Sequence, residues 1–181
     1  MAKTSDKQES KNKNSLLIRL IPILIVSALI VHFQQNIIWN ITESVNGRIG
    51  YITNTKPEKG DYVNFLFTHE LLANREDLND AKDNISNKFR LTKKLTCVPG
   101  DRLKTVEKNL YCNGEKVATA LDRTGSGKPL QPFQWDGMIP KGKAIVLGET
   151  DDSFDSRYWG FIDIEKLNKV VLLASSAAVS H

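Results

Sequence analysis

Residues 91–101 read LTKKLTCVPGD, and this stretch indicates how the chain folds. Successive side chains of a strand point to opposite faces of a sheet, so Leu91, Lys93, Leu95 and Cys97 share one face. Lys93 is the only polar residue on that otherwise apolar face. The letters PGD that follow are typical of a tight turn. The stretch therefore predicts a strand that carries a lysine toward a core and ends at a turn.

Similar short apolar runs, separated by turn residues, lie on both sides of this strand. Asn113-Gly114 predicts a two-residue hairpin turn, because both residues tolerate positive φ. Helical patterning is confined to residues 69–82, at the start of a charged insertion over residues 70–88. The sequence thus predicts a mainly β domain with a small helical insertion. The expected strands are residues 62–67, 91–98, 110–112, 117–120, 143–148 and 170–174.

An apolar segment precedes this domain. Residues 16–33 are almost wholly apolar and would span roughly 27 Å as a helix, enough for a bilayer core. Pro22 is expected in the first turns of that helix, and Trp39 at the far membrane interface. The alternative is a cleaved signal peptide, with Ser27 in a small-residue cleavage site. Against it, the apolar run continues past that site through residues 29–31. We therefore expect a tail at 1–15, a transmembrane anchor at 16–35 and a folded domain at 36–181. The tail is predicted to be disordered up to residue 14.

The charge distribution restricts the class of protein and the topology. Of 181 residues, 40% are hydrophobic and 25% charged, which excludes disorder throughout. The net charge is +4, yet five basic and two acidic residues precede Leu20, so most of the excess lies in the tail. A nucleic-acid partner is not expected, because the folded domain is nearly neutral. The basic tail predicts a cytoplasmic N-terminus and a domain on the outer side of the membrane.

The chemistry suggested by these residues is that of a lysine base. His32, His69 and His181 have no neighbours that suggest a Ser-His-Asp arrangement, and no metal or cofactor site is expected. A lysine facing a core loses hydration of its ammonium form, so its pKa falls and its neutral amine can activate a serine. The alternative is that Lys93 reaches solvent on an edge strand and guards against aggregation.

Four sequence boxes resemble those of type I signal peptidases. Residues 93–101 (KKLTCVPGD) are similar to the family's lysine box, and residues 153–160 (SFDSRYWG) to its last box. Residues 59–65 (KGDYVNF) resemble the Gly-Asp strand between the serine and lysine boxes, and residues 136–142 (DGMIPKG) the lead-in to the last box. The resemblance covers residues 40–174. It implies a signal-peptidase-like β catalytic domain and a serine endopeptidase activity that uses a Ser/Lys dyad.

The serine box departs from the family pattern Ser-Met-x-Pro. The candidate nucleophile Ser44 is followed by Val45, and Asn46 stands where proline is usual. The spacing Asn40-x-Thr42-x-Ser44 is more similar to the TraF-type branch, small conjugative-transfer peptidases that process pilin precursors. Phe154 in the last box also suits that branch. We expect these departures and Phe154 to alter the wall of a cleft that accepts small side chains.

The resemblance implies a role for each matching residue. Ser44 would attack the scissile carbonyl, and Lys93 would take its proton and return one to the leaving amine. The Ser44 N–H and the Thr42 hydroxyl would hold the oxyanion. Ser153 would orient Lys93. The last box also implies a structural ion pair beneath the site, formed by Asp155 and Arg157.

Two cysteines are expected to form a disulfide. Cys97 and Cys112 each precede a turn, consistent with neighbouring strands, and an outward-facing domain lies in an oxidising compartment. Closing such a loop stabilises by about 3 kcal/mol in the chain-entropy model. Two buried free thiols are the alternative.

The expected function is that of an endopeptidase anchored by one helix in a bacterial inner membrane, with its catalytic domain in the periplasm. Ser44 lies only eleven residues past Phe33, so the nucleophile would work near the membrane surface. The expected substrate is an exported precursor, chiefly a conjugative pilin, with hydrolysis or cyclisation as the outcome and the conjugative transfer machinery as a partner. The alternatives are a general signal peptidase and a non-catalytic assembly protein of the secretion channel.

Overall fold

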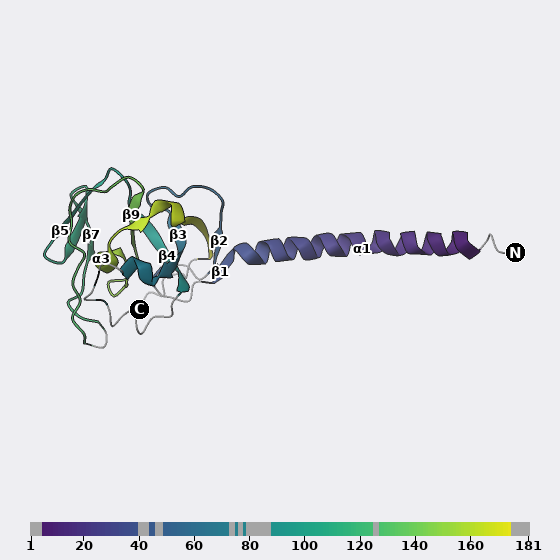
Figure 1. Ribbon diagram of the computed structural model, residues 1–181, viewed down its shortest axis with the longest axis horizontal. Coiled ribbons are helices and arrows are strands. Elements are labelled where there is room, and N and C mark those ends of the chain that lie inside the picture. Colours follow the sequence, from purple (N-terminus) through teal and green to yellow (C-terminus); the bar gives the residue numbers. More distant parts are fainter. Residues whose placement is uncertain are drawn as a thin grey trace. The chain divides into compact units, whose positions relative to one another are not determined.

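A computed structural model of the chain describes residues 5–39, 44–45, 49–72, 75, 78, 88–124 and 127–174. The chain divides into two compact units, Met1–Ile37 and Ile38–His181. The first unit is dominated by one helix, and the second contains nearly all of the strands (Figure 1).

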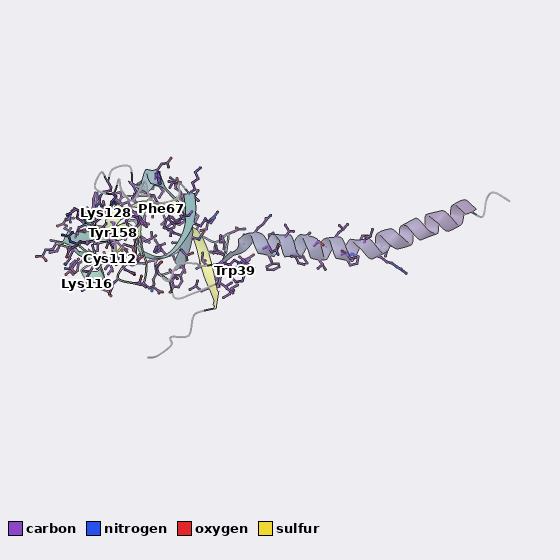
Figure 2. All side chains as sticks on the ribbon, turned by 90° about the horizontal axis from the view of Figure 1, so that it is seen from below. Trp39, Phe67, Cys112, Lys116, Lys128 and Tyr158 are labelled. Atoms are coloured by element: carbon purple, nitrogen blue, oxygen red, sulfur yellow. A yellow bond between two sulfur atoms is a disulfide. The ribbon has the colours of Figure 1, made fainter. Side chains whose placement is uncertain are left out.

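The helix of the first unit, α1 (Ser5–Asn36), is longer than the expected anchor. The prediction of disorder up to residue 14 was wrong from Ser5 onward, because no glycine or proline interrupts the chain before Pro22. Pro22 consequently lies in the helix interior instead of its first turns. Within α1, Ile18–Asn36 is long and apolar enough to cross a membrane. Its apolar side chains project outward around the helix and are exposed (Figure 2), as an anchor requires.

The second unit contains two antiparallel sheets. The larger has the order β1-β2-β11-β3-β4-β9-β10 and the smaller the order β7-β6-β5-β8. The strands of the larger sheet are, in chain order, β1 (Ile37–Trp39), β2 (Ile49–Ile52), β3 (Tyr62–Thr68), β4 (Lys88–Cys97), β9 (Lys143–Leu147), β10 (Ile162–Asp163) and β11 (Asn168–Ala174). Those of the smaller are β5 (Arg102–Val106), β6 (Asn109–Cys112), β7 (Glu115–Thr119) and β8 (Asp136–Met138).

The helical content of this unit is small. It consists of η1 (His69–Leu72), α3 (Ser156–Trp159) and η3 (Ile164–Lys166) among the described residues. In the charged insertion, Leu72 and Leu78 are buried and belong to the first core cluster. The expected fold class, mainly β with a small helical part and one apolar N-terminal helix, is confirmed.

Every expected strand overlaps an observed one, and the predicted hairpin is present. Asn113 and Gly114 have φ values of 53° and 87°, and β6 and β7 pair antiparallel around them. The strands β1, β2, β5, β8 and β10 were not predicted. They have between two and five residues, too short for alternation to be read from the sequence.

The core consists of two clusters, and β9 contributes to both. Ala144 and Val146 pack in the first cluster with residues of β3, β4 and α3, whereas Ile145 and Leu147 pack in the second, beside the smaller sheet. A strand buried on both faces reads as a continuous apolar run, which residues 144–147 do. The end of β9 therefore emerges between the two clusters, where the candidate site lies.

Candidate active site

Lys93 lies on β4, the strand between β3 and β9. It is paired with Val63 across the sheet, and it is only 2% exposed. Leu91 and Leu95, on the same face, belong to the first core cluster, as strand alternation predicts. The burial excludes the alternative of an edge lysine that reaches solvent.

Burial also changes the acid–base chemistry of this lysine. It lowers the pKa of Lys93 to about 8, because the ammonium form loses its hydration. The negative charge of Asp155 acts in the opposite direction, and the positive charge of Arg157 adds to the lowering. At pH 7 a pKa of 8 leaves about 10% of the amine neutral, against about 0.03% for an ordinary lysine. The neutral base is therefore several hundred times more abundant.

Two serine hydroxyls from distant segments lie beside the Lys93 amine. Lys93 Nζ is 2.9 Å from Ser44 Oγ and 2.7 Å from Ser153 Oγ. Ser153 is 4% exposed, and Ser44 lies between β1 and β2 in neither strand. The Glu149 N–H donates to the Ser44 carbonyl at 2.8 Å. The structure thus brings together Ser44, Lys93 and Ser153, which sequence comparison had placed in three separate boxes.

Gly148 is a residue of this site that the sequence reasoning missed. A Cβ at this position would lie 2.1 Å from Ser153 Oγ and 3.1 Å from Lys93 Nζ. Both distances are shorter than ordinary van der Waals contact, so only glycine allows Ser153 to approach Lys93. The sequence carries a signal, since a glycine ends the apolar run of β9, but the predicted strand over residues 143–148 includes that glycine.

Asp155 and Arg157 form a buried ion pair that holds the β9–α3 loop (residues 148–155). Arg157 Nε donates to Asp155 Oδ1 at 2.8 Å, and the Gly148 N–H donates to Asp155 Oδ2 at 2.8 Å. Arg157 also donates to the carbonyls of Thr150 and Asp151, at 3.1 and 2.7 Å. Asp155 and Arg157 are 0% and 2% exposed. Removing either partner would leave an uncompensated buried charge, so the pair keeps the loop in one conformation.

Phe154 packs among the aromatic residues of α3. Its ring stacks on Tyr158 and lies edge-on to Trp159, with centroids 5.7 and 5.1 Å apart, and it packs against the first core cluster. Phe154 is partly buried, so the expectation that it alters the wall of the cleft stays a prediction. Thr42, Asn40 and Asn46 lie outside the described residues, so the oxyanion role of Thr42 stays a prediction.

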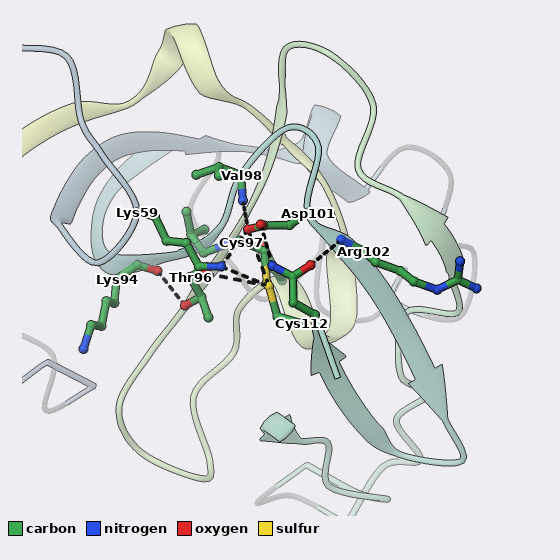
Figure 3. The surroundings of a disulfide bond; sticks show 11 residues. Lys59, Lys94, Thr96, Cys97, Val98, Asp101, Arg102 and Cys112 are labelled. Atoms are coloured by element: carbon green, nitrogen blue, oxygen red, sulfur yellow. Dashed lines mark hydrogen bonds and ion pairs between the residues drawn. A yellow bond between two sulfur atoms is a disulfide. The ribbon is translucent and has the colours of Figure 1, made fainter. Parts of the chain in front are cut away.

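The two cysteines are joined in a disulfide, Cys97–Cys112, with Cα atoms 6.3 Å apart (Figure 3). Asp101 connects the turns around it. Its carboxylate accepts from the Val98 N–H at 3.0 Å, from Asn113 Nδ2 at 2.7 Å and from Lys59 Nζ at 2.8 Å. Three turns that are separated in sequence therefore meet at one carboxylate.

No metal centre is indicated at this cluster. Among the described residues, Cys97, Asp101 and Cys112 are the one group of potential ligand atoms close enough to share an ion. Because the two sulfurs are bonded to each other, they offer no thiolate to a metal.

A cavity of about 510 Å³ is lined in part by the start of the β9–α3 loop. Its lining includes Leu95 and Leu147 from the core strands, Gly148 and Glu149 from the β9–α3 loop, and the charged residues Lys94 and Lys116. Ser44, Lys93 and Ser153 are not among its lining residues. A larger cavity of about 850 Å³, lined by Leu71, Trp159 and Phe161 among others, likewise contains none of these three residues.

A family model and a curated relative indicate one family. A family model described as "Signal peptidase, peptidase S26" matches residues 12–173. A protein of Synechocystis sp. named "Probable signal peptidase I-2" is 31% identical over 112 residues, which cover 61% of this chain and 44% of that protein. The match thus spans less than half the length of that relative. The crystal structure of a signal peptidase I from Enterococcus faecalis V583 aligns with a TM-score of 0.37 at 22% identity, over 66% of this chain and 99% of that chain.

Proposed function

The chain belongs to the signal peptidase family, peptidase S26, and we propose that it is a membrane-anchored serine endopeptidase that cleaves exported precursor proteins. One observation carries the proposal: the buried Lys93 amine, with its lowered pKa, lies within hydrogen-bond distance of both Ser44 Oγ and Ser153 Oγ. A base with a pKa near the working pH, in contact with a hydroxyl, is what nucleophilic catalysis by serine requires.

In the proposed mechanism the neutral Lys93 amine accepts the Ser44 proton as Oγ attacks the scissile carbonyl. The tetrahedral intermediate collapses to an acyl-enzyme, and the Lys93 ammonium returns a proton to the leaving amine. Water, activated by the same amine, then releases the acyl group. The Ser153 hydroxyl orients the amine toward Ser44, and the Ser44 N–H with the Thr42 hydroxyl is the proposed oxyanion site.

The proposed topology has α1 crossing the inner membrane once, with the N-terminus in the cytoplasm and the second unit in the periplasm. The apolar span Ile18–Asn36 supports one crossing, and the basic residues before Leu20 support this orientation. The Cys97–Cys112 disulfide is also consistent with an oxidising compartment.

Two substrate classes are distinguished within this proposal. The narrower one is a conjugative pilin precursor, with the transfer machinery as partner and with hydrolysis or cyclisation of the acyl-enzyme as outcome. It rests on the spacing of Asn40, Thr42 and Ser44 and on the missing Met and Pro after Ser44. The second class is the general range of secreted preproteins, which the printed name of the Synechocystis relative favours.

The deciding experiment is covalent labelling of the purified full chain with a serine-reactive probe, followed by peptide mapping. We expect labelling at Ser44, loss of labelling in Ser44→Ala and Lys93→Ala, and normal labelling in Lys94→Ala. Lys94 is the matched control because it is the neighbouring lysine of the same strand and its side chain is exposed. A wild-type chain that cannot be labelled at Ser44 would favour the remaining alternative, a non-catalytic assembly protein.

A further inference from the structure

Glu149 links Ser44 to the opposite side of the site through two separate groups. Its backbone N–H donates to the Ser44 carbonyl at 2.8 Å. Its side chain accepts a hydrogen bond from the Tyr62 hydroxyl, with Tyr62 Oη 2.5 Å from Glu149 Oε1. Tyr62 begins β3 and is paired with Lys94, the residue after the candidate base. A chain of contacts therefore runs from β3 through Glu149 to the residue that carries the nucleophile.

We propose that Tyr62 and Glu149 are positioning residues that set the distance between Ser44 and Lys93. The inference rests on the proposed function, because it assigns a role in the reaction of the same dyad. Ser44 lies outside the strands on either side of it, and its carbonyl accepts a hydrogen bond from the Glu149 N–H. Lys93, in contrast, is fixed by its place within β4.

The β9–α3 loop is held from two sides at this point. From the core side, the Asp155–Arg157 pair binds Gly148, Thr150 and Asp151. Tyr62 binds the intervening Glu149 from β3. Gly148 sets the approach of Ser153 to Lys93, and the next residue contacts Ser44. Movement of this short segment would thus alter both hydroxyl contacts of the Lys93 amine together.

The hydrogen bond between Tyr62 and Glu149 persists over the pH range in which Lys93 titrates. Burial and the Glu149 carboxylate raise the pKa of Tyr62 to about 12, so the phenol keeps its proton and remains a donor at any pH at which Lys93 titrates. The acceptor is charged, which strengthens the hydrogen bond, whereas the exposure of the Glu149 side chain to water weakens it. The ring of Tyr62 is partly buried, so Tyr62→Phe removes the donor while keeping the packing.

The test compares Tyr62→Phe with Tyr111→Phe in the full chain, by cleavage of a fluorogenic peptide that has alanine before the scissile bond. Tyr111 is a matched control because it undergoes the same chemical change on β6 of the smaller sheet. For Tyr62→Phe we expect kcat to fall roughly tenfold, the size expected for one charge-assisted hydrogen bond, with KM within about twofold and an unchanged melting temperature. Tyr111→Phe should behave as wild type.

Glu149 variants separate positioning from a general structural effect. Glu149→Ala should match Tyr62→Phe, since it removes the acceptor but keeps the backbone N–H. Glu149→Gln should recover most of the activity, because its amide oxygen still accepts from the phenol. The double variant Tyr62→Phe/Glu149→Ala should be no slower than either single variant, as expected when both remove the same hydrogen bond.

Three results would overturn the inference. The first is an unchanged kcat in Tyr62→Phe and Glu149→Ala. The second is a raised KM at constant kcat, which would place the pair on the substrate instead. The third is a lowered melting temperature with normal activity of the folded fraction. Failure of the proposed function is recognised separately, since the wild-type chain would then show no labelling at Ser44.

Discussion

Substitution of Gly148 by alanine is the sharpest single test of the geometry of the site. The new Cβ would lie 2.1 Å from Ser153 Oγ and 2.6 Å from Ser153 Cβ. Restoring ordinary contact, which begins at 3.4 Å, requires a shift of about 1.3 Å in Ser153 or in the loop. Ser153 is 4% exposed, so the surrounding core opposes that shift.

The size of the effect follows from the contact that is lost. A shift of this size breaks the 2.7 Å hydrogen bond between Ser153 Oγ and Lys93 Nζ. A displacement of about 1 Å in a catalytic group lowers the rate by about a hundredfold. Overpacking also destabilises by about 1–3 kcal/mol. We expect Gly148→Ala to lower kcat by about a hundredfold and to reduce the melting temperature by several degrees.

The assay measures kcat on the fluorogenic alanine peptide together with the melting temperature. Gly137→Ala is the matched control, because the nearest atom to its added Cβ would be Trp135 Nε1, at an ordinary 3.5 Å. The double variant Gly148→Ala/Ser153→Gly removes the clashing side chain. It should regain stability without regaining activity, since Lys93 still lacks its partner. Wild-type kcat and stability in Gly148→Ala alone would refute the placement of Ser153 against Lys93.

Four further predictions concern the dyad, its titration, the topology and the substrate. Cleavage should be abolished, with an unchanged circular dichroism spectrum, in Ser44→Ala, Lys93→Ala and Lys93→Arg. The arginine variant should be inactive because a guanidinium cannot act as a base. Substantial activity in any of the three would remove the dyad assignment. Because the neutral amine is the reactive form, activity should rise with pH with a midpoint about 8, and an acid optimum would indicate a carboxylate base. A periplasm-dependent reporter should be active when fused after His181 and inactive when fused within the first fourteen residues, and the opposite result would reverse the proposed orientation. The pilin hypothesis predicts that the protein matures a conjugative pilin precursor, as measured by mass spectrometry. It also predicts that the protein does not rescue growth of a conditional mutant in the housekeeping signal peptidase. Growth rescue together with an unprocessed pilin would favour the general enzyme.

The sequence alone determined the features that depend on local geometry. The burial of Lys93 follows from the two-residue period of a strand, because the apolar neighbours on its face must pack inward. The turn at Asn113 and Gly114 follows from their tolerance of positive φ, which is a property of the residues themselves. The span within α1 follows from apolar length. None of these predictions needed knowledge of a distant partner.

Short strands show where that local information ends. In β5 (Arg102–Val106), Leu103 is the one fully buried residue, so its side chains show no clear alternation. The strand is defined by its backbone pairing with both β6 and β8. The same limit applies to the packing of Phe154. Its contacts with Tyr158 and Trp159 depend on the conformation of α3, which the residue pattern does not indicate.

Only the tertiary structure decided the geometry of the site. Ser44 and Ser153 are 49 and 60 residues from Lys93, and their approach depends on the order β3-β4-β9 and on the conformation of the β9–α3 loop. The need for glycine at position 148 and the link from Tyr62 through Glu149 to Ser44 arise from the same assembly. The physical reason is that contact between distant residues depends on strand order and register, which result from packing of the whole domain and leave no periodic signal in the residues concerned.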